Sequence, residues 1–80
     1  MHYVYLLQSR SDPSQWYTGC TQALRERLAL HNQGSVPHTA KYAPWELVTS
    51  IAFRDAEKAF AFEKYLKSGS GRAFALKHLR

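Results

Sequence analysis

The chain has 80 residues, a length that permits one compact domain with one hydrophobic core and argues against a second. Hydrophobic residues make up 45% of the sequence and aromatic residues 14%, which excludes a largely disordered chain. Eleven Lys and Arg against six Asp and Glu give a net charge of +5. This charge favours a polyanionic partner such as nucleic acid, although a basic protein without such a partner has the same balance.

Cys20 is the only cysteine, which excludes an intramolecular disulfide and any zinc site built from paired cysteines. The first apolar run, residues 3–7, is too short for a signal peptide, and no stretch reaches the roughly 20 apolar residues of a membrane span. We therefore expect a soluble, cytoplasmic, monomeric protein with one domain over residues 1–80 and no membrane contact.

The first 20 residues predict a β-hairpin. Residues 2–8 are rich in Tyr, Val and Leu, and residues 9–14 form a turn-forming cluster that ends the strand. Residues 16–20 return to β-favouring side chains, so we expect a second strand antiparallel to the first. Gly19 lies in this strand, where the missing side chain lets another group approach the backbone closely.

A helix and a loop are expected next. Thr21 can cap a helix over residues 22–32 that Gly34 ends, with Leu24 and Leu28 as its apolar line. The following segment contains Gly and Pro and has no periodicity, so it is predicted to be an irregular basic loop. This loop spans Gln33 to Pro44 and includes His38 and Lys41.

A third strand and two helices are predicted in the second half. Residues 45–53 alternate with a period of two, typical of a strand. The side chains expected on one face of it are Leu47, Thr49, Ile51 and Phe53. Asp55 can cap a helix to about Ser68, and Gly69 is expected to stop it in the left-handed conformation. A last short helix is expected from Ser70 to Leu79.

One acidic residue falls in the apolar stripe of the helix after Asp55. A helical wheel places Glu63 in the middle of this stripe. The other members of the stripe are Ala56, Ala59, Phe60 and Leu66. Because an unpaired buried carboxylate is costly, Glu63 must have a partner, open into a cleft or be protonated. Lys67, one turn later, would supply an ion pair, and the alternative is a metal ligand in a cleft.

Polar side chains of other elements are candidates to share a site with Glu63. Arg27 and His31 lie one turn apart beside the leucine line and lean toward the sheet. Taken singly, His31 could be a histidine of the core edge and Arg27 the partner of a surface acid. Tyr5 and Tyr17 come from the paired strands, where plain aromatic packing is the other interpretation.

These residue types suit phosphodiester hydrolysis, which needs an activated water, cations beside the phosphoryl oxygens and relief for the leaving oxygen. Mg²⁺ binds through one carboxylate together with waters and phosphate oxygens, so Glu63 alone is sufficient as its protein anchor. Free tyrosine has a pKa of about 10, so a tyrosine base would need a nearby cation in order to lose its proton.

The chain contains an ordered set of short motifs. Two tripeptides come first, followed by an arginine in the first predicted helix and a glutamate in the second. The tripeptides are Tyr3-Val4-Tyr5 and Tyr17-Thr18-Gly19. The second opens the segment YTGCTQALRERLALH, which carries Arg27 and His31, and Glu63 lies in FEKYLKSGSG. Each tripeptide alone is a weak signal, but the ordered set resembles the GIY-YIG nuclease family over nearly the whole chain, most closely its short stand-alone bacterial members.

The resemblance implies an α+β fold with a three-stranded antiparallel sheet flanked by helices, in the order ββαβαα. It implies a metal-dependent endonuclease acting on nucleic acid, with DNA as the expected substrate, repair or recombination as the expected setting, and Mg²⁺ or Mn²⁺ bound by Glu63. Tyr5 and Tyr17 would position or deprotonate the attacking water, and which of them is the base stays open. Arg27 would hold the scissile phosphate, and His31 would assist proton transfer or phosphate binding.

The sequence also departs from the family pattern. Tyr3 replaces the glycine of the first tripeptide and Thr18 the aliphatic residue of the second. Many family nucleases carry a polar residue, often Asn, after the helical glutamate, and no Asn occurs in residues 69–80, so slow turnover is expected. The family usually owes its target choice to an attached DNA-binding domain, which is not expected here, so weak sequence preference is expected. A non-cleaving nucleic-acid-binding module and a subunit recruited by a protein partner are the alternatives. Nucleic-acid contacts are expected at His38, Lys41, Lys67, Arg72 and Lys77.

Overall fold

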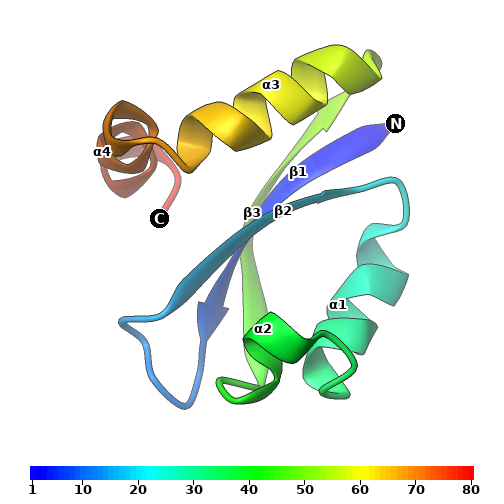
Figure 1. Ribbon diagram of the computed structural model, residues 1–80, viewed down its shortest axis with the longest axis vertical. Helices are drawn as coiled ribbons and strands as arrows, with labels where there is room; N and C mark the ends of the chain where they lie inside the picture. Colours follow the sequence, from blue (N-terminus) through cyan, green and yellow to red (C-terminus); the bar gives the residue numbers. More distant parts are fainter.

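A three-stranded antiparallel sheet separates two layers of helices in the computed structural model, which covers residues 1–80 (Figure 1). The strand order is β2-β1-β3, so β1 is central and β2 has a free edge. The strands are β1 (His2–Ser9), β2 (Trp16–Thr21) and β3 (Trp45–Phe53). The helices are α1 (Leu24–Asn32), α2 (Pro37–Ala40), α3 (Ala56–Leu66) and α4 (Gly69–His78). The predicted α+β class with its three-stranded antiparallel sheet is confirmed.

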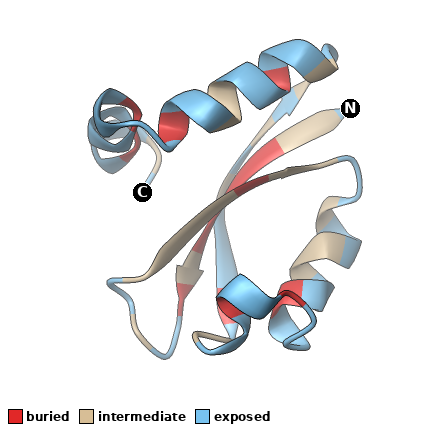
Figure 2. Cartoon of the chain, viewed as in Figure 1, coloured by how far each residue is buried: buried red, intermediate tan, exposed pale blue.

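The central strand supplies both halves of the core. Val4 and Leu6 pack against α3 and α4, whereas Tyr5 and Leu7 face α1 and α2 with Trp45. All four side chains of β1 are at most 1% exposed, because successive residues of a strand point to opposite faces and both faces are covered by helices. Figure 2 shows the resulting buried stretch along β1. None of the helices is long and apolar enough to cross a membrane.

The third strand contains an irregularity that overturns one expectation. The register against β1 shifts between Leu6 and Leu7, so that Thr49 pairs with Leu6. Leu47 pairs with Leu7, and Val48 is the extra residue between the two pairs. Such a bulge changes which side chains share a face. Leu47 therefore lies on the α1 side and Thr49 on the α3 side, and the prediction that they share one face is wrong.

The first helix starts later than expected. Ala23 occupies the N-cap position without a side-chain hydrogen bond, so the prediction that Thr21 caps the helix is wrong. The Thr21 hydroxyl instead accepts a hydrogen bond from the Ala23 amide, 3.1 Å away, in a turn just before the helix. The end at Gly34 is confirmed, since its φ of 75° is a left-handed conformation that glycine adopts without strain.

The segment predicted as an irregular loop contains a short helix, α2. Pro37 is its first residue, where the fixed φ of proline suits a helix and its missing amide proton costs nothing. The four-residue length leaves almost no periodic signal in the sequence, which explains why it was not predicted. The element order is therefore ββααβαα, with α2 added to the expected ββαβαα.

Only two residues, Lys67 and Ser68, separate the helices α3 and α4. Asp55 caps α3 as expected, accepting from the amides of Glu57 and Lys58. Gly69 does not stop α3 in a left-handed conformation; it is the first residue of α4, which Ser68 caps by accepting from the Gly71 amide. The last helix therefore starts one residue earlier than predicted.

The buried face of α3 differs from the predicted stripe at one position. Ala59 and Leu66 are buried in the core, but Phe60 is 54% exposed. Phe62 is the aromatic residue that packs against this core, in contact with Phe53. The prediction that Phe60 belongs to the buried stripe is wrong, because the helix is rotated so that its buried side lies closer to Phe62.

Candidate active site

The ring of Tyr5 lies across the second strand at the glycine of the second tripeptide. Tyr5 on β1 and Gly19 on β2 are register partners. A Cβ atom added to Gly19 would be 2.4 Å from the Tyr5 hydroxyl oxygen and 2.6 Å from its Cζ. The close approach expected at Gly19 is thus made by Tyr5 itself, and it directs the hydroxyl of a central-strand residue toward the free edge of β2.

A buried chain of hydrogen bonds begins at this hydroxyl. The Tyr5 oxygen lies 3.0 Å from Nε2 of His31, and Nδ1 of His31 lies 2.8 Å from the Thr39 hydroxyl. The Thr39 hydroxyl donates its one proton to the carbonyl of Val36, so it accepts from His31. From this pattern we assign the tautomer in which Nδ1 of His31 carries the proton and Nε2 accepts a hydrogen bond from Tyr5.

Burial sets the protonation states of this pair. Burial raises the pKa of Tyr5 to about 12, with the charges of Tyr17 and Glu63 acting in the same direction and Arg27 opposing them. Burial also lowers the pKa of His31, and the positive charge of Arg27 lowers it further. At neutral pH Tyr5 therefore keeps its proton, and the imidazole of His31 is neutral with a lone pair aimed at it.

Arg27 and Tyr17 complete this side of the site. The Tyr5 hydroxyl lies beside the Arg27 guanidinium. Its hydrogen bond is the main reason that the pKa of Arg27 is raised, and Tyr17 raises this pKa to a smaller extent. The ring of Tyr17 has its centroid 4.7 Å from that of His31 and 6.2 Å from that of Tyr5. The structure thus brings four of the predicted site residues together, from β1, β2 and α1.

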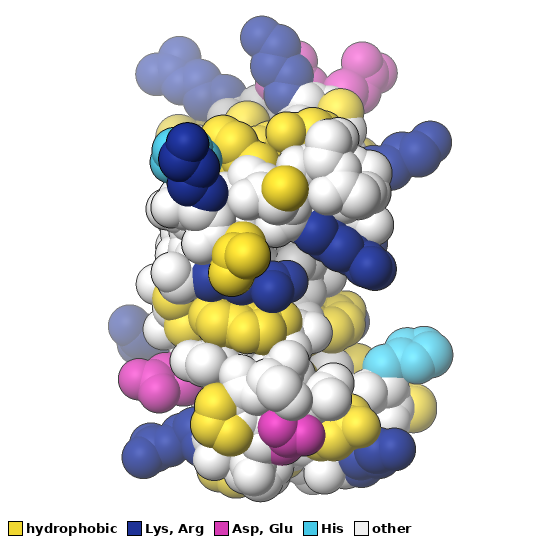
Figure 3. Space-filling view, turned by 90° about the vertical axis from the view of Figure 1, so that its left-hand side faces the viewer, with side chains coloured by type: hydrophobic (Ala, Val, Ile, Leu, Met, Phe, Trp, Pro, Cys, Tyr) yellow, Lys and Arg dark blue, Asp and Glu magenta, His cyan; other side chains and the backbone are white.

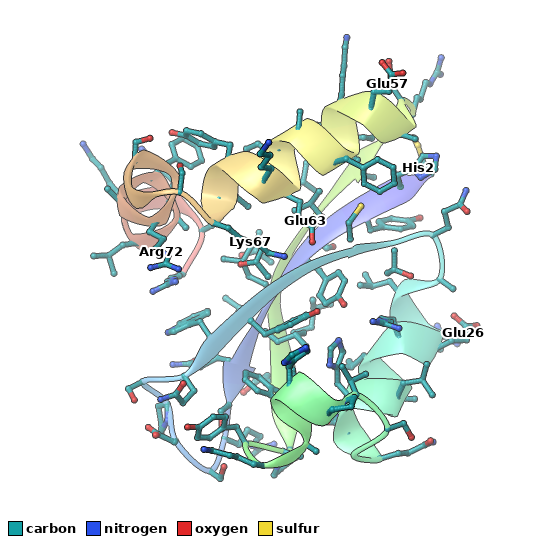
Figure 4. The ribbon with its side chains drawn as sticks, in the orientation of Figure 1. His2, Glu26, Glu57, Glu63, Lys67 and Arg72 are labelled. Carbon is teal, nitrogen blue, oxygen red and sulfur yellow. The ribbon has the colours of Figure 1, made fainter.

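Glu63 approaches from the opposite layer. Its negative charge raises the pKa of Tyr5 and also that of Cys20, whose side chain faces α3. Cys20 and Tyr5 lie on opposite faces of neighbouring strands, so the charge of Glu63 acts on both faces of the sheet at this end of β2. Figure 4 shows it pointing from α3 toward the strands, whereas Glu57 of the same helix points away.

The ion pair considered for Glu63 is present. Lys67 Nζ lies 3.0 Å from Glu63 Oε2, one helical turn away. The Glu63 side chain is 22% exposed and that of Lys67 53%, so the pair opens to solvent and is not enclosed in the core. Glu63 therefore has both a partner and an opening, and an ion pair of this exposure contributes little to stability.

The donor set fits a hard divalent ion held by one protein ligand. No group of three or more His, Cys, Asp or Glu residues is placed to hold a metal. Such a group is required for zinc, whereas Mg²⁺ keeps several waters and accepts a single carboxylate. Glu63 is the carboxylate at the site, and its partner Lys67 is exposed and on a flexible side chain, so an incoming cation can displace it.

The basic residues expected to contact nucleic acid do not form one surface. His38 and Lys41 are exposed at α2, on the far side of the sheet from α4 (Figure 1). Lys67 and Arg72 line a pocket beside β2, whereas Lys77 on α4 is exposed and lines no pocket. Only Lys67 and Arg72 therefore share a pocket with one of the residues gathered at the site, Tyr17.

Three residues that hold His31 in place were missed by the sequence analysis. The Asn32 side chain bonds both the amide and the carbonyl of Trp45, and the Trp45 indole donates to the Thr39 carbonyl at 2.9 Å. These bonds tie α1, α2 and the start of β3 together around the imidazole. The partners lie 6 and 13 residues apart in the sequence and form no local motif. The one available signal was Trp45, whose indole needs an acceptor when buried.

The chain is similar in sequence to a family model and to several bacterial proteins. A family model described as the GIY-YIG catalytic domain matches residues 1–76, which include all the residues gathered at the site. UPF0213 protein BH0048 of Halalkalibacterium halodurans is 35% identical over 72 residues, covering 89% of this chain and 74% of that protein. A UPF0213 protein of Streptococcus pneumoniae is 35% identical over 66 residues, 81% of this chain and 65% of its own length.

A solved structure agrees with these matches. The solution NMR structure of the UPF0213 protein BH0048 from Bacillus halodurans has a TM-score of 0.57 to this chain at 32% sequence identity, covering 95% of this chain and 82% of that one. The family model spans residues 1–76, and the shared fold covers 95% of this chain. On these grounds the chain belongs to the GIY-YIG nuclease family.

Proposed function

We propose that this protein is a metal-assisted endonuclease that hydrolyses phosphodiester bonds of DNA, in repair or recombination. The observation that carries the proposal is the Tyr5 hydroxyl, which is bonded to a neutral, buried His31 and lies beside Arg27, with Glu63 approaching from the opposite face of the sheet. A cation and a proton acceptor therefore meet at one hydroxyl, and a carboxylate that could hold a metal ion lies across β2. These groups could activate a water and place positive charge beside the phosphoryl and leaving oxygens, as hydrolysis of a phosphodiester needs.

Arg27 is the phosphate-binding residue of this proposal. Its guanidinium stays charged at every relevant pH and presents donors in a fork that matches two phosphoryl oxygens. The side chain is half-buried beside Tyr5 and Tyr17, which limits the conformations it can adopt. A phosphate bound there would have the Tyr5 hydroxyl next to it.

Tyr5 and His31 form a relay for the proton of the attacking water. Because its pKa is about 12, Tyr5 is not a phenolate in the resting protein. It accepts a proton from water only as it gives its own proton to Nε2 of His31, which then becomes an imidazolium. The O–H bond of water breaks, a new O–H bond forms on Tyr5, and the displaced proton ends on His31. The assigned tautomer has its Nε2 lone pair directed at the Tyr5 hydroxyl, as this transfer needs.

Glu63 is the anchor for Mg²⁺ or Mn²⁺ in this proposal. A divalent ion bound there would supply positive charge to the phosphoryl and leaving oxygens and lower the pKa of water. The carboxylate points from α3 toward the strands. Its ion pair with Lys67 would balance its charge until a metal ion takes the place of the ammonium. Loss of Glu63 would remove the metal but leave Arg27 and the relay intact.

A second function is favoured by one observation. The ammonium of Lys67 occupies the carboxylate that would hold the metal, and the chain carries a net charge of +5. A nucleic-acid-binding module that does not cleave, or that cleaves only when a protein partner displaces Lys67, would show the same two features. The two functions differ in whether purified protein with metal cuts DNA.

The test is incubation of purified protein with branched, nicked, single-stranded and duplex DNA in Mg²⁺, in Mn²⁺ and in chelator. We expect metal-dependent cleavage of at least one substrate and a loss of about 100-fold or more in Glu63→Ala. Glu57→Ala is the matched control, because Glu57 lies on the same helix and points away from the site. Equal rates in the two variants would reveal a contaminating nuclease. Salt-sensitive binding without cleavage would favour the binding module, and cleavage only after addition of cell extract would favour the partner-dependent subunit.

A further inference from the structure

A pocket of about 520 Å³ lies along the free side of β2 toward α4, and Tyr17 of the candidate active site is one of its lining residues. We call it the β2–α4 pocket. The lining side chains that matter here are Trp16, Tyr17, Leu66, Lys67, Arg72 and Arg80. Tyr17 also contacts His31, and Lys67 pairs with Glu63, so the pocket and the candidate active site share two walls.

The wall of the β2–α4 pocket is strongly basic. Lys67, Arg72 and Arg80 line it, and none of its lining residues is acidic. Figure 4 shows Lys67, just after the end of α3, beside the strands, and Arg72 on the lower side of α4. The view onto this end of the molecule shows Lys and Arg side chains across the middle of the face with hydrophobic side chains beside them (Figure 3). Cations concentrated in a concave surface bind phosphate groups.

The second feature of the pocket is an aromatic ring, Trp16, on which a planar cation, the Arg80 guanidinium, is stacked. The Arg80 guanidinium carbon lies 4.9 Å from the centre of the Trp16 ring. Trp16 is half-buried, with one side packed against the core around Val4 and Leu6. Arg80 covers the other face, so a nucleobase would stack on Trp16 in place of the Arg80 guanidinium. Such stacking on aromatic side chains is a main source of affinity in single-strand binding sites.

We propose that the β2–α4 pocket binds one unpaired nucleotide next to the scissile phosphodiester, with its phosphate held by Lys67 and Arg72 and its base stacked on Trp16. The proposal rests on the endonuclease function proposed above and names its substrate class: DNA with a single-stranded nucleotide beside the cut. A paired base within a duplex has both faces covered by its neighbours and cannot stack on Trp16. The pocket therefore distinguishes a frayed, branched or single strand from continuous duplex.

Binding can be measured without cleavage. Glu63→Gln protein in chelator is titrated with a single-stranded oligothymidylate and with a blunt duplex of equal length at matched salt, while tryptophan fluorescence is recorded. Trp45 is 4% exposed and bonded to Thr39, so a change in emission reports on Trp16, and Trp16→Phe verifies that assignment. We expect the single strand to change the emission and to bind about 5-fold or more tightly than the duplex.

A pair of arginine variants locates the phosphate contact. Arg72→Gln and Arg54→Gln remove the same charge, but Arg54 is exposed at the opposite end of α3 and lines neither pocket. In the Glu63→Gln background, Arg72→Gln should weaken single-strand binding several-fold and reduce the slope of log affinity against log salt by about 0.7. Arg54→Gln should leave both values close to those of the parent.

Equal affinity for duplex and single strand, an unchanged Trp16 emission, or equal effects of the two arginine variants would overturn the proposal. The cleavage assay with unmodified protein is independent of these results. Cleavage without a Trp16 response would remove the nucleotide pocket and keep the endonuclease. A Trp16 response in a protein that never cleaves would keep the pocket and remove the endonuclease.

Discussion

The hydroxyl of Tyr5 lies 3.0 Å from Nε2 of His31, and the two side chains are 1% and 0% exposed. Tyr5→Phe would leave the imidazole lone pair buried without a donor, at a cost of about 1–3 kcal/mol in unfolding free energy. It would also remove the proton relay, so cleavage should fall by about 100-fold or more. Chemical denaturation and the cleavage assay measure the two effects. Tyr3→Phe on the same strand is the control, and an equal loss of cleavage in both variants would contradict the relay.

The neutral state of His31 predicts a loss of stability in mild acid. Its pKa is lowered in the folded protein, so an unfolded chain takes up the proton first. The stability contributed by neutral His31 is fully present above the unfolded pKa of 6.5 and is lost as the pH falls below it toward the folded pKa. The melting temperature should fall as the pH is lowered from about 8 to about 5, and it should fall less in His31→Gln. His38→Gln, at an exposed position, should keep the decline; a decline of the same size in His31→Gln would assign it to another group.

A methyl group at the second tripeptide glycine should displace the Tyr5 ring. The added Cβ in Gly19→Ala would be 2.4 Å from the Tyr5 hydroxyl oxygen, which requires the ring or β2 to move. We expect a loss of about 1–3 kcal/mol in unfolding free energy and at least about tenfold in cleavage rate. Gly69→Ala is the matched control, because nothing lies within 4 Å of its added Cβ and alanine favours the helix there. Native-like activity in Gly19→Ala would show that Tyr5 is not where the reaction occurs.

Removal of the lysine partner should expose the metal anchor. Lys67→Ala breaks the ion pair with Glu63, so the carboxylate no longer has to exchange an ammonium for a metal ion. Mn²⁺ affinity, measured by electron paramagnetic resonance, should rise several-fold, while the free energy of unfolding changes by less than about 1 kcal/mol. Lys64→Ala controls for the change in net charge on the same helix. A metal affinity that is equal in both variants, or lower in Lys67→Ala, would argue against Glu63 as the anchor.

Local chemistry was sufficient to predict much of the fold. The Asp55 cap and the Gly34 helix end depend on interactions within a few residues of each other, and the structure has both. The three strands follow from their β-favouring composition and alternation. The rotation of α3, which exposes Phe60, depends on how the helix packs on the sheet, and an apolar stripe on a wheel does not fix this angle to within one residue.

The features that depend on distant pairing were not predictable. The bulge at Val48 arises where the register of β3 against β1 shifts, and no residue type in β3 indicates a bulge there. Thr39 looked like one more polar residue of a loop, yet it determines which nitrogen of His31 carries the proton. The residues Tyr5, Arg27 and Glu63 could be nominated from order and type alone. Their common neighbourhood requires the fold, because they come from different layers.

Helices on opposite faces of the sheet carry His31 and Glu63, with β2 between them. The reach from proton acceptor to carboxylate is consequently set by the thickness of one layer of backbone, a dimension that side-chain replacement barely alters. Substitutions within either helix layer can tilt these groups but cannot bring them much closer together or farther apart. Chains with very different cores can therefore keep the same span for a phosphodiester.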